Sequence, residues 1–215
     1  RLNIPLVRPF RTSFGTEVVR DVILVEAISA DGTHGWGECS TMSWPGYSYE
    51  YSDTAVDVIS THLLPALKEV TDADDPADVR AAMEIVRGHP MAKSAVSTAL
   101  LDVWLRERSM PLSAYLGAVR DRVDCGVSVG IPPSESISDL VDEVGGYVDA
   151  GYRRIKLKIE PGWDVEPLAA VRERWPDIPL QTDANQAYTR ADSGHLASLD
   201  EFDLLLHEQP LPEDD

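Results

Sequence analysis

The chain has 215 residues, of which 19 are basic (Lys and Arg) and 37 are acidic, so its formal net charge is −18. This composition is typical of globular proteins, and the length suffices for one or two domains. The charge argues against a general nucleic-acid binder and against docking on an anionic membrane, because both need a basic face. It leaves a small anionic substrate open, since a local cationic pocket can lie inside an acidic protein.

No apolar stretch is long enough to span a membrane and the opening residues do not resemble a secretory signal, so we expect a cytoplasmic protein.

The first part of the chain predicts strands followed by helices. Residues 18–30 are rich in Val and Ile, and Asp31-Gly32 provides a hairpin turn into a second short strand through Trp36. Three helical segments follow, namely 52–70, a segment that starts after Asp75-Pro76, and 92–108. This order predicts a small α+β domain over residues 1–119.

From residue 120 onward, predicted strands and helices alternate. The strands are 123–131, 153–159, 180–185 and 203–211, and the helices between them are 134–150, 164–175 and 192–199. This alternation predicts a parallel sheet with right-handed crossovers, either an open doubly wound sheet or a TIM-type barrel. The segment 130–133 (GIPP) lacks a Gly-rich phosphate-binding fingerprint, which disfavours a dinucleotide-binding fold. Four strands cannot close a barrel of eight, so we expect residues 120–215 to form the first half of a (β/α) barrel whose remainder lies beyond residue 215.

Two of the four lysines of the chain, Lys156 and Lys158, lie two residues apart in a predicted strand. Strand side chains alternate, so both lysines share one face and the apolar side chains of Ile155, Leu157 and Ile159 share the other. In a barrel the apolar face meets the helices, so the two lysines point inward. Desolvation and mutual repulsion should then lower the pKa of both, which suits a lysine to act as a base. The alternative is an edge strand with a solvated lysine face.

Two carboxylates end the next two predicted strands at a regular spacing. Asp183 lies 25 residues after Lys158, and Glu208 lies 25 residues after Asp183. One strand–helix unit separates each from the next, so all three should lie at a similar height at the carboxyl ends of neighbouring strands. Paired carboxylates suit a hard divalent cation such as Mg²⁺. The alternative makes Asp183 a helix cap and Glu208 a salt-bridge partner of a lysine.

Together these residues predict a particular chemistry. A cation held by carboxylates can neutralise the oxygens of a substrate carboxylate while its α-carbon loses a proton to a neighbouring lysine. A Schiff-base lysine aldolase is an alternative that needs no metal carboxylates. A non-catalytic barrel fragment is a second alternative from another class.

Several segments resemble motifs of the enolase superfamily. In the second predicted domain these are 155–164 (IKLKIEPGWD), 183–185 (DAN) and 208–211 (EQPL). In the first they are 11–16 (RTSFGT), 35–39 (GWGEC) and 91–93 (MAK). The resemblance covers essentially the whole chain. It is closest to the muconate-lactonising subgroup, and within it to o-succinylbenzoate synthases and N-succinyl (N-acyl) amino acid racemases.

The resemblance implies a role for each matching residue. Lys158 would be the acid/base, and Lys156 would help to hold the substrate carboxylate. Asp183 and Glu208 would be the first two ligands of Mg²⁺, with Mn²⁺ or another divalent cation as substitutes. The polar part of the pocket would be lined by Asn185 and Ser128. The first domain would cap the barrel and close over the acyl or side-chain end of the substrate through Phe14, Met42 and Tyr47.

The resemblance also implies a lyase or isomerase that acts on a small-molecule carboxylate, in menaquinone biosynthesis or amino acid metabolism. Dehydration and racemisation use the same base, and the residues present do not separate the two. A third metal carboxylate and an opposite-face lysine would come from later strands, beyond residue 215. Dipeptide epimerases and muconate cycloisomerases are less close alternatives. We also expect a homo-oligomer.

Overall fold

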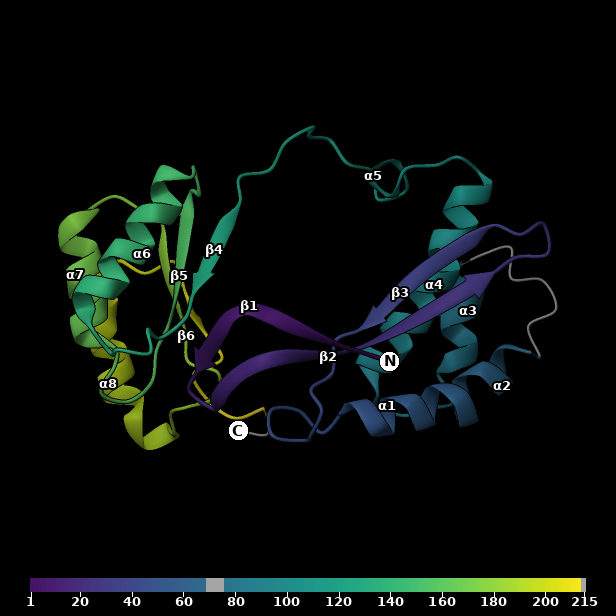
Figure 1. The fold of residues 1–215 in the computed structure, drawn as a ribbon, viewed down its shortest axis with the longest axis horizontal. Helices are drawn as coiled ribbons and strands as arrows, with labels where there is room; N and C mark the ends of the chain where they lie inside the picture. The colour runs from purple at the N-terminus through teal and green to yellow at the C-terminus, as the bar shows by residue number, and fades with distance from the viewer. Residues whose placement is uncertain (69–75, 214–215) are drawn as a thin grey trace. The chain divides into compact units, whose positions relative to one another are not determined.

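A computed structural model describes residues 1–68 and 76–213. The chain forms two compact units, each with its own hydrophobic core (Figure 1). The first unit comprises Arg1–Pro5 and Val19–Asp121, and the second comprises Leu6–Val18 and Arg122–Asp215. The end of the helix predicted over 52–70 and the predicted cap Asp75 lie outside the described residues.

A three-stranded sheet opens the chain. Its strands are β1 (Leu2–Thr12), β2 (Gly15–Ile28) and β3 (His34–Cys39), in the order β1-β2-β3. The hairpin predicted at Asp31-Gly32 is confirmed, because β2 and β3 are antiparallel and Gly32 has a φ of +87° between them. Strand β1 was not predicted, since its two prolines are unusual inside a strand. The end of the β1–β2 hairpin, residues 6–18, belongs to the second unit.

Helix α4 (Pro90–Glu107) packs against β3, and the other helices of the first unit pack on α4 or on one another. These others are α1 (Ser52–Val58), the π-helical η1 (Ile59–Leu63), α2 (Leu64–Leu67), α3 (Pro76–Met83) and α5 (Leu112–Tyr115). The predicted start of a helix at Pro76 is confirmed, and α4 closely matches the predicted helix 92–108. Gly37 lies so close to α4 that a Cβ there would overlap the Ala95 carbonyl oxygen. The core of this unit therefore depends on a strand that approaches a helix backbone directly.

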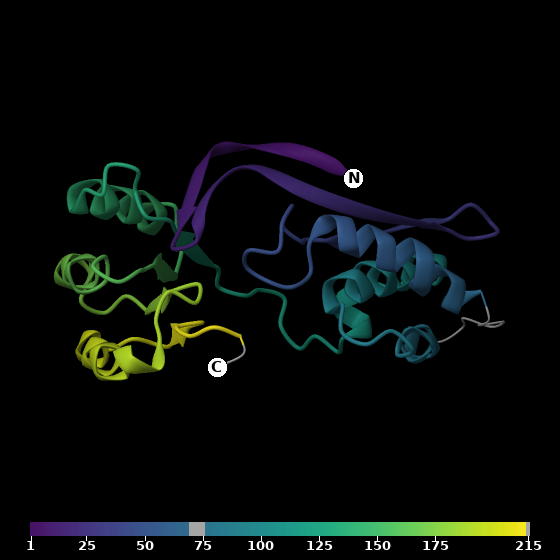
Figure 2. The ribbon, with the colours of Figure 1, turned by 90° about the horizontal axis from the view of Figure 1, so that it is seen from below.

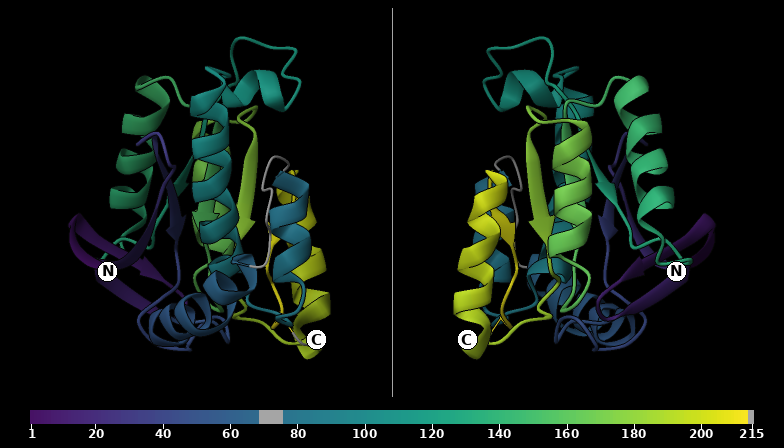
Figure 3. Two further views of the ribbon diagram at one scale, coloured as in Figure 1. Left: turned by 90° about the vertical axis from the view of Figure 1, so that its right-hand side faces the viewer. Right: turned by 90° about the vertical axis from the view of Figure 1, so that its left-hand side faces the viewer.

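A four-stranded parallel sheet forms the second unit. Its strands follow one another in the order β4 (Gly126–Val129), β5 (Arg154–Lys158), β6 (Leu180–Asp183) and β7 (His207–Glu208). The connections contain α6 (Ile137–Asp149), α7 (Val165–Arg174), η2 (Arg190–Asp192), α8 (Ser193–Ser198) and η3 (Leu199–Phe202). The three α-helices lie in chain order along one face of the sheet (Figures 2 and 3). A doubly wound sheet has helices on both faces, so this arrangement is that of a partial barrel, as predicted.

The apolar face of this sheet packs against the helices. Ile155, Leu157 and Ile159 are almost completely buried in one cluster with Leu140 of α6 and Leu168 of α7. Burying each such side chain contributes about 1.5–3 kcal/mol. The predicted orientation of strand β5 is thereby confirmed, and its two lysines lie on the opposite face. Among the described residues, no helix is long and apolar enough to span a membrane.

Candidate active site

Polar side chains form two rows across the face of the parallel sheet that is turned away from the helices. One row joins the last residues of three strands, with Lys158 beside Asp183 and Asp183 beside Glu208. The second row lies two residues earlier along the strands and contains Ser128 and Lys156, which are register partners. The predicted alignment of Lys158, Asp183 and Glu208 at the carboxyl ends of neighbouring strands is confirmed.

Both lysines donate hydrogen bonds to these carboxylates. Lys158 Nζ lies 2.7 Å from Asp183 Oδ2 and 2.7 Å from the Asn185 side-chain oxygen. Lys156 Nζ lies 3.0 Å from Asp183 Oδ2 and 3.0 and 3.1 Å from the two Glu208 carboxylate oxygens. Strand β5 is flanked by β4 and β6, and Lys158 is buried. The alternative of an edge strand with a solvated lysine face is therefore wrong.

The two lysines have opposite pKa shifts. Burial lowers the pKa of Lys158 and outweighs its hydrogen bond to Asp183. Burial also acts to lower the pKa of Lys156, but hydrogen bonds to Asp183 and Glu208 outweigh it, and the pKa is raised. The prediction that both values fall is wrong for Lys156, because the sequence spacing does not show that this ammonium contacts both carboxylates. Burial acts to raise the pKa of Asp183, but its hydrogen bonds to the two lysines lower it.

Asp183 and Glu208 have the donor chemistry of a divalent-cation site. Their carboxylate oxygens converge on one cationic atom, Lys156 Nζ, at 3.0 Å from each residue. Oxygen ligands of this kind suit Mg²⁺. The described residues contain no group of three or more His, Cys, Asp or Glu side chains that could hold a metal ion. Asp183 and Glu208 therefore provide part of a set of divalent-cation ligands, and not a complete set.

The two predicted polar pocket residues both lie beside the lysines. Asn185 accepts the hydrogen bond from Lys158, and its backbone has a φ of +44°. Ser128 is the register partner of Lys156. Its hydroxyl is buried, and the described residues offer it no hydrogen-bond partner. An unpaired buried hydroxyl is unfavourable, so it is available to a bound ligand.

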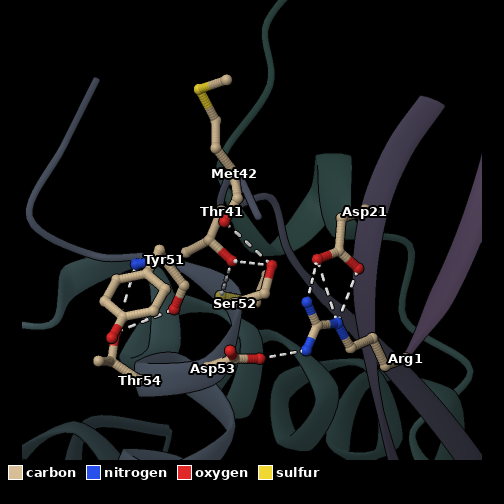
Figure 4. Close-up of polar contacts among 9 residues, drawn as sticks. Arg1, Asp21, Thr41, Met42, Tyr51, Ser52, Asp53 and Thr54 are labelled. Carbon is tan, nitrogen blue, oxygen red and sulfur yellow. Dashed lines mark hydrogen bonds and ion pairs between the residues drawn. The ribbon is translucent and has the colours of Figure 1, made fainter. Parts of the chain in front are cut away.

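The three residues predicted to close over the substrate are divided between the units. Phe14 belongs to the second unit, whereas Met42 and Tyr47 belong to the first. The Met42 carbonyl accepts hydrogen bonds from the Ser52 backbone at 2.8 Å and the Ser52 hydroxyl at 3.1 Å. Its side chain points away from this polar cluster, which also contains the Arg1–Asp21 ion pair (Figure 4). The roles of all three residues stay predictions.

Sequence reasoning missed the contribution of the hairpin end, residues 6–18, to the second unit. The Lys158 ammonium lies 5.9 Å from the centre of the Phe10 ring, and the Ser13 hydroxyl donates to the Ala184 carbonyl at 2.7 Å. Arg11 forms ion pairs with Glu135 and Glu160. These contacts join residues 124 to 171 positions apart, which meet only through tertiary structure. The local sequence signal for this contact is the segment 11–16, which resembles a family motif.

The fold and the site define a class: a parallel α/β barrel segment with lysines and carboxylates at the carboxyl ends of its strands. Residues 2–117, more than half of the chain, match the family described as mandelate racemase / muconate lactonizing enzyme, N-terminal domain. Residues 139–215 match the enolase C-terminal domain-like family. The chain therefore belongs to the mandelate racemase / muconate lactonizing enzyme family of the enolase superfamily, which confirms the resemblance.

Known proteins of this family are similar over the whole chain. An N-succinylamino acid racemase of an Amycolatopsis species is 54% identical over 216 residues, covering 100% of this chain and 58% of that protein. An o-succinylbenzoate synthase of Geobacillus kaustophilus is 42% identical, covering 100% and 56%. The solved structure of a probable mandelate racemase from Alicyclobacillus acidocaldarius has a TM-score of 0.88 at 39% identity, covering 100% and 57%. The chain thus spans little more than half the length of these relatives.

Proposed function

We propose that this chain belongs to a divalent-cation-dependent enzyme that removes the α-proton of a carboxylate substrate. The reaction would be that of an o-succinylbenzoate synthase, an N-succinylamino acid racemase, or both. The main support is the row of Lys158, Asp183 and Glu208 on neighbouring strands, in which Lys158 donates a hydrogen bond to Asp183, together with relatives that have these two names.

In this proposal Lys158 Nζ is the base. Its lowered pKa increases the fraction of neutral amine that can accept a proton. The α-proton passes to Nζ, and the electron pair of the C–H bond moves into the substrate carboxylate. Return of a proton to the α-carbon from the opposite face gives racemisation. In dehydration, the C–O bond of a β-hydroxyl group breaks, a C=C bond forms, and the leaving oxygen takes the proton from Lys158 Nζ and departs as water.

Lys156 has a different role. Its raised pKa keeps the ammonium charged, so it can offset the negative charge of the substrate carboxylate. Asp183 and Glu208 would hold the cation, Mg²⁺ or in its place Mn²⁺. When bound, the cation supplies further positive charge where the substrate accumulates negative charge.

Other parts of the proposal depend on the resemblance and on composition. Residues 1–119 would form the capping domain and 120–215 the partial barrel. Phe14, Met42 and Tyr47 would contact the acyl or side-chain end of the substrate. The protein would be a cytoplasmic homo-oligomer that binds neither nucleic acid nor membranes, and it would act in menaquinone biosynthesis or amino acid metabolism.

Proton NMR in D₂O tests the reaction. The full-length protein with Mg²⁺ is offered an N-succinylamino acid and, separately, the precursor of o-succinylbenzoate. We expect loss of the α-proton signal or formation of o-succinylbenzoate, and we expect EDTA to stop either change. Exchange that continues without a divalent cation would favour the Schiff-base alternative.

The variant Lys158→Ala tests the base. We expect it to abolish turnover, because no other described side chain accepts the proton in this proposal. Lys68→Ala, which removes a lysine of the first unit, is the matched control and should leave the rate unchanged. A near-normal rate for Lys158→Ala would show that the base is assigned wrongly.

A further inference from the structure

The turn that follows β6 holds Asn185 against Lys158 in an unusual backbone conformation. Asn185 and Gln186 have φ values of +44° and +69°, in the left-handed region. Asn tolerates this region better than most residues, whereas for Gln it is unfavourable. Such a turn persists only where its surroundings hold it in place. The position of the Asn185 oxygen on Lys158 therefore depends on what fixes the turn.

Backbone hydrogen bonds fix one side of the turn. The amides of Ala184, Gln186 and Tyr188 donate to the carbonyls of the last residue of β7 and of the two residues after it, at 3.1, 2.7 and 3.0 Å respectively. Their acceptors are Glu208, Gln209 and Pro210. These bonds join the turn to the segment that follows β7. The Asn185 amide also donates to Asp183 Oδ1 at 3.0 Å, and the Ser13 hydroxyl donates to the Ala184 carbonyl at 2.7 Å. The side chain of Tyr188 adds a contact of a different kind, to a neighbouring strand–helix connection.

A buried carboxylate anchors the Tyr188 side chain. The Tyr188 ring is 1% exposed, and its hydroxyl donates to Asp164 Oδ2 at 2.7 Å. Asp164 lies at the start of α7, directly after the segment that follows β5. Its other oxygen accepts the Val165 amide at 2.7 Å, and His195 of α8 contacts Oδ2 at 2.6 Å. Asp164 is thus held from three directions and joins the segments after β5 and β6.

We propose that Asp164 and Tyr188 are positioning residues whose hydrogen bond fixes the turn and thereby holds the Asn185 oxygen on Lys158 Nζ. In this proposal neither side chain contacts the substrate or the cation. The inference rests on the proposed role of Lys158 as the base. It adds that the position of Lys158 depends on the hydrogen bond between Tyr188 and Asp164, which lies behind the turn on the helix side of the sheet.

Tyr188→Phe removes the hydroxyl and keeps the ring. In the full-length enzyme we expect kcat for α-proton exchange to fall roughly 10-fold, since a misplacement of about 1 Å in a reacting group can cost about 100-fold. KM should change little, because no group that contacts substrate is lost. Tyr152→Phe makes the same change at a half-buried tyrosine of the same unit and should leave kcat unchanged.

A double-mutant cycle separates positioning from simple destabilisation. If Tyr188 acts through Asn185, then Tyr188→Phe should have almost no further effect on kcat in an Asn185→Ala background. A full additional loss in that background would overturn the inference, as would equal kcat values for Tyr188→Phe and Tyr152→Phe. The side-chain amide NMR signal of Asn185 gives a second readout, and it should shift in Tyr188→Phe only.

Lys158→Ala, measured in the same series, distinguishes the two proposals. If that variant keeps a normal rate, the proposed function fails whatever Tyr188 does. If that variant is inactive while Tyr188→Phe matches the control, only the positioning role fails.

Discussion

At the scale of residues, Lys156 and Lys158 show that environment decides the chemistry of identical side chains. Lys156 contacts two carboxylates, whereas Lys158 is more deeply buried and contacts one carboxylate and the neutral amide of Asn185. The pKa of the first is raised and that of the second is lowered. This difference supports assigning the base to Lys158 and the charge-offsetting role to Lys156.

Asp164 gives a pH prediction at the same scale. Burial acts to raise its pKa, but hydrogen bonds from His195, Tyr188 and the Val165 amide lower it below 3.8. A carboxyl group whose pKa is lower in the folded than in the unfolded state stabilises the fold above the unfolded-state value. That stability is lost as the pH falls through the folded-state value.

We therefore expect Asp164→Asn to reduce the free energy of unfolding by about 1.5–3 kcal/mol near neutral pH, the contribution typical of hydrogen bonds to a charged group. The difference from wild type should shrink as the pH falls below 3.8. Urea unfolding at several pH values measures this. Asp177→Asn, at an exposed acidic residue, is the control. A difference for Asp164→Asn that stays constant with pH would contradict the assigned cause.

At the scale of elements, the contact of β3 with α4 requires residues without a side chain. A Cβ on Gly37 would overlap the Ala95 carbonyl oxygen and lie 2.8 Å from the Ala99 nitrogen. Both are backbone atoms in the middle of a helix, so they cannot move independently. Gly146, within helix α6, has open space where its Cβ would lie.

These two glycines predict opposite effects of the same substitution. Gly37→Ala should destabilise the protein by about 3 kcal/mol or more, because strand and helix must separate. Gly146→Ala should stabilise it by about 0.5–1 kcal/mol, because alanine restricts the unfolded chain and favours the helix. Thermal or urea unfolding of both variants tests the packing. An equal effect of the two would show that β3 does not approach α4 as closely as described.

At the scale of the whole molecule, the chain forms two units with separate cores, and the candidate cation site lies in the second. The second unit presents its carboxylates on the polar face of the sheet, where a bound cation would be linked to the folded state. A ligand that binds only the folded state stabilises it by about 2.7 kcal/mol at 100 times its dissociation constant. Mg²⁺ should therefore raise the thermal midpoint of the protein as its concentration increases.

Asp183→Asn tests this linkage without measuring activity. The variant should lose most of the Mg²⁺-dependent rise in midpoint, since one carboxylate ligand is missing. Asp177→Asn again provides the control and should keep the full rise. An unchanged response of Asp183→Asn to Mg²⁺ would remove Asp183 from the ligand set.

The sequence by itself determined most of the second unit. Alternation in strands predicted which face of β5 packs on the helices, and the regular spacing predicted that Lys158, Asp183 and Glu208 align. These features follow from the local geometry of strands and from the repeat of one strand and one helix. The predicted strands were longer than those observed, because pairing, which depends on neighbours, sets where a strand ends.

Only the tertiary structure decided the rest. It brought the hairpin end with Phe10 to Lys158, gave Lys156 two carboxylate partners, and joined Asp164 to Tyr188 behind the Asn185 turn. Each of these contacts joins residues from separate elements, up to about 150 positions apart. Side-chain periodicity contains no information on such pairs, because their distance is set by how the elements pack and not by the residues beside them in the chain.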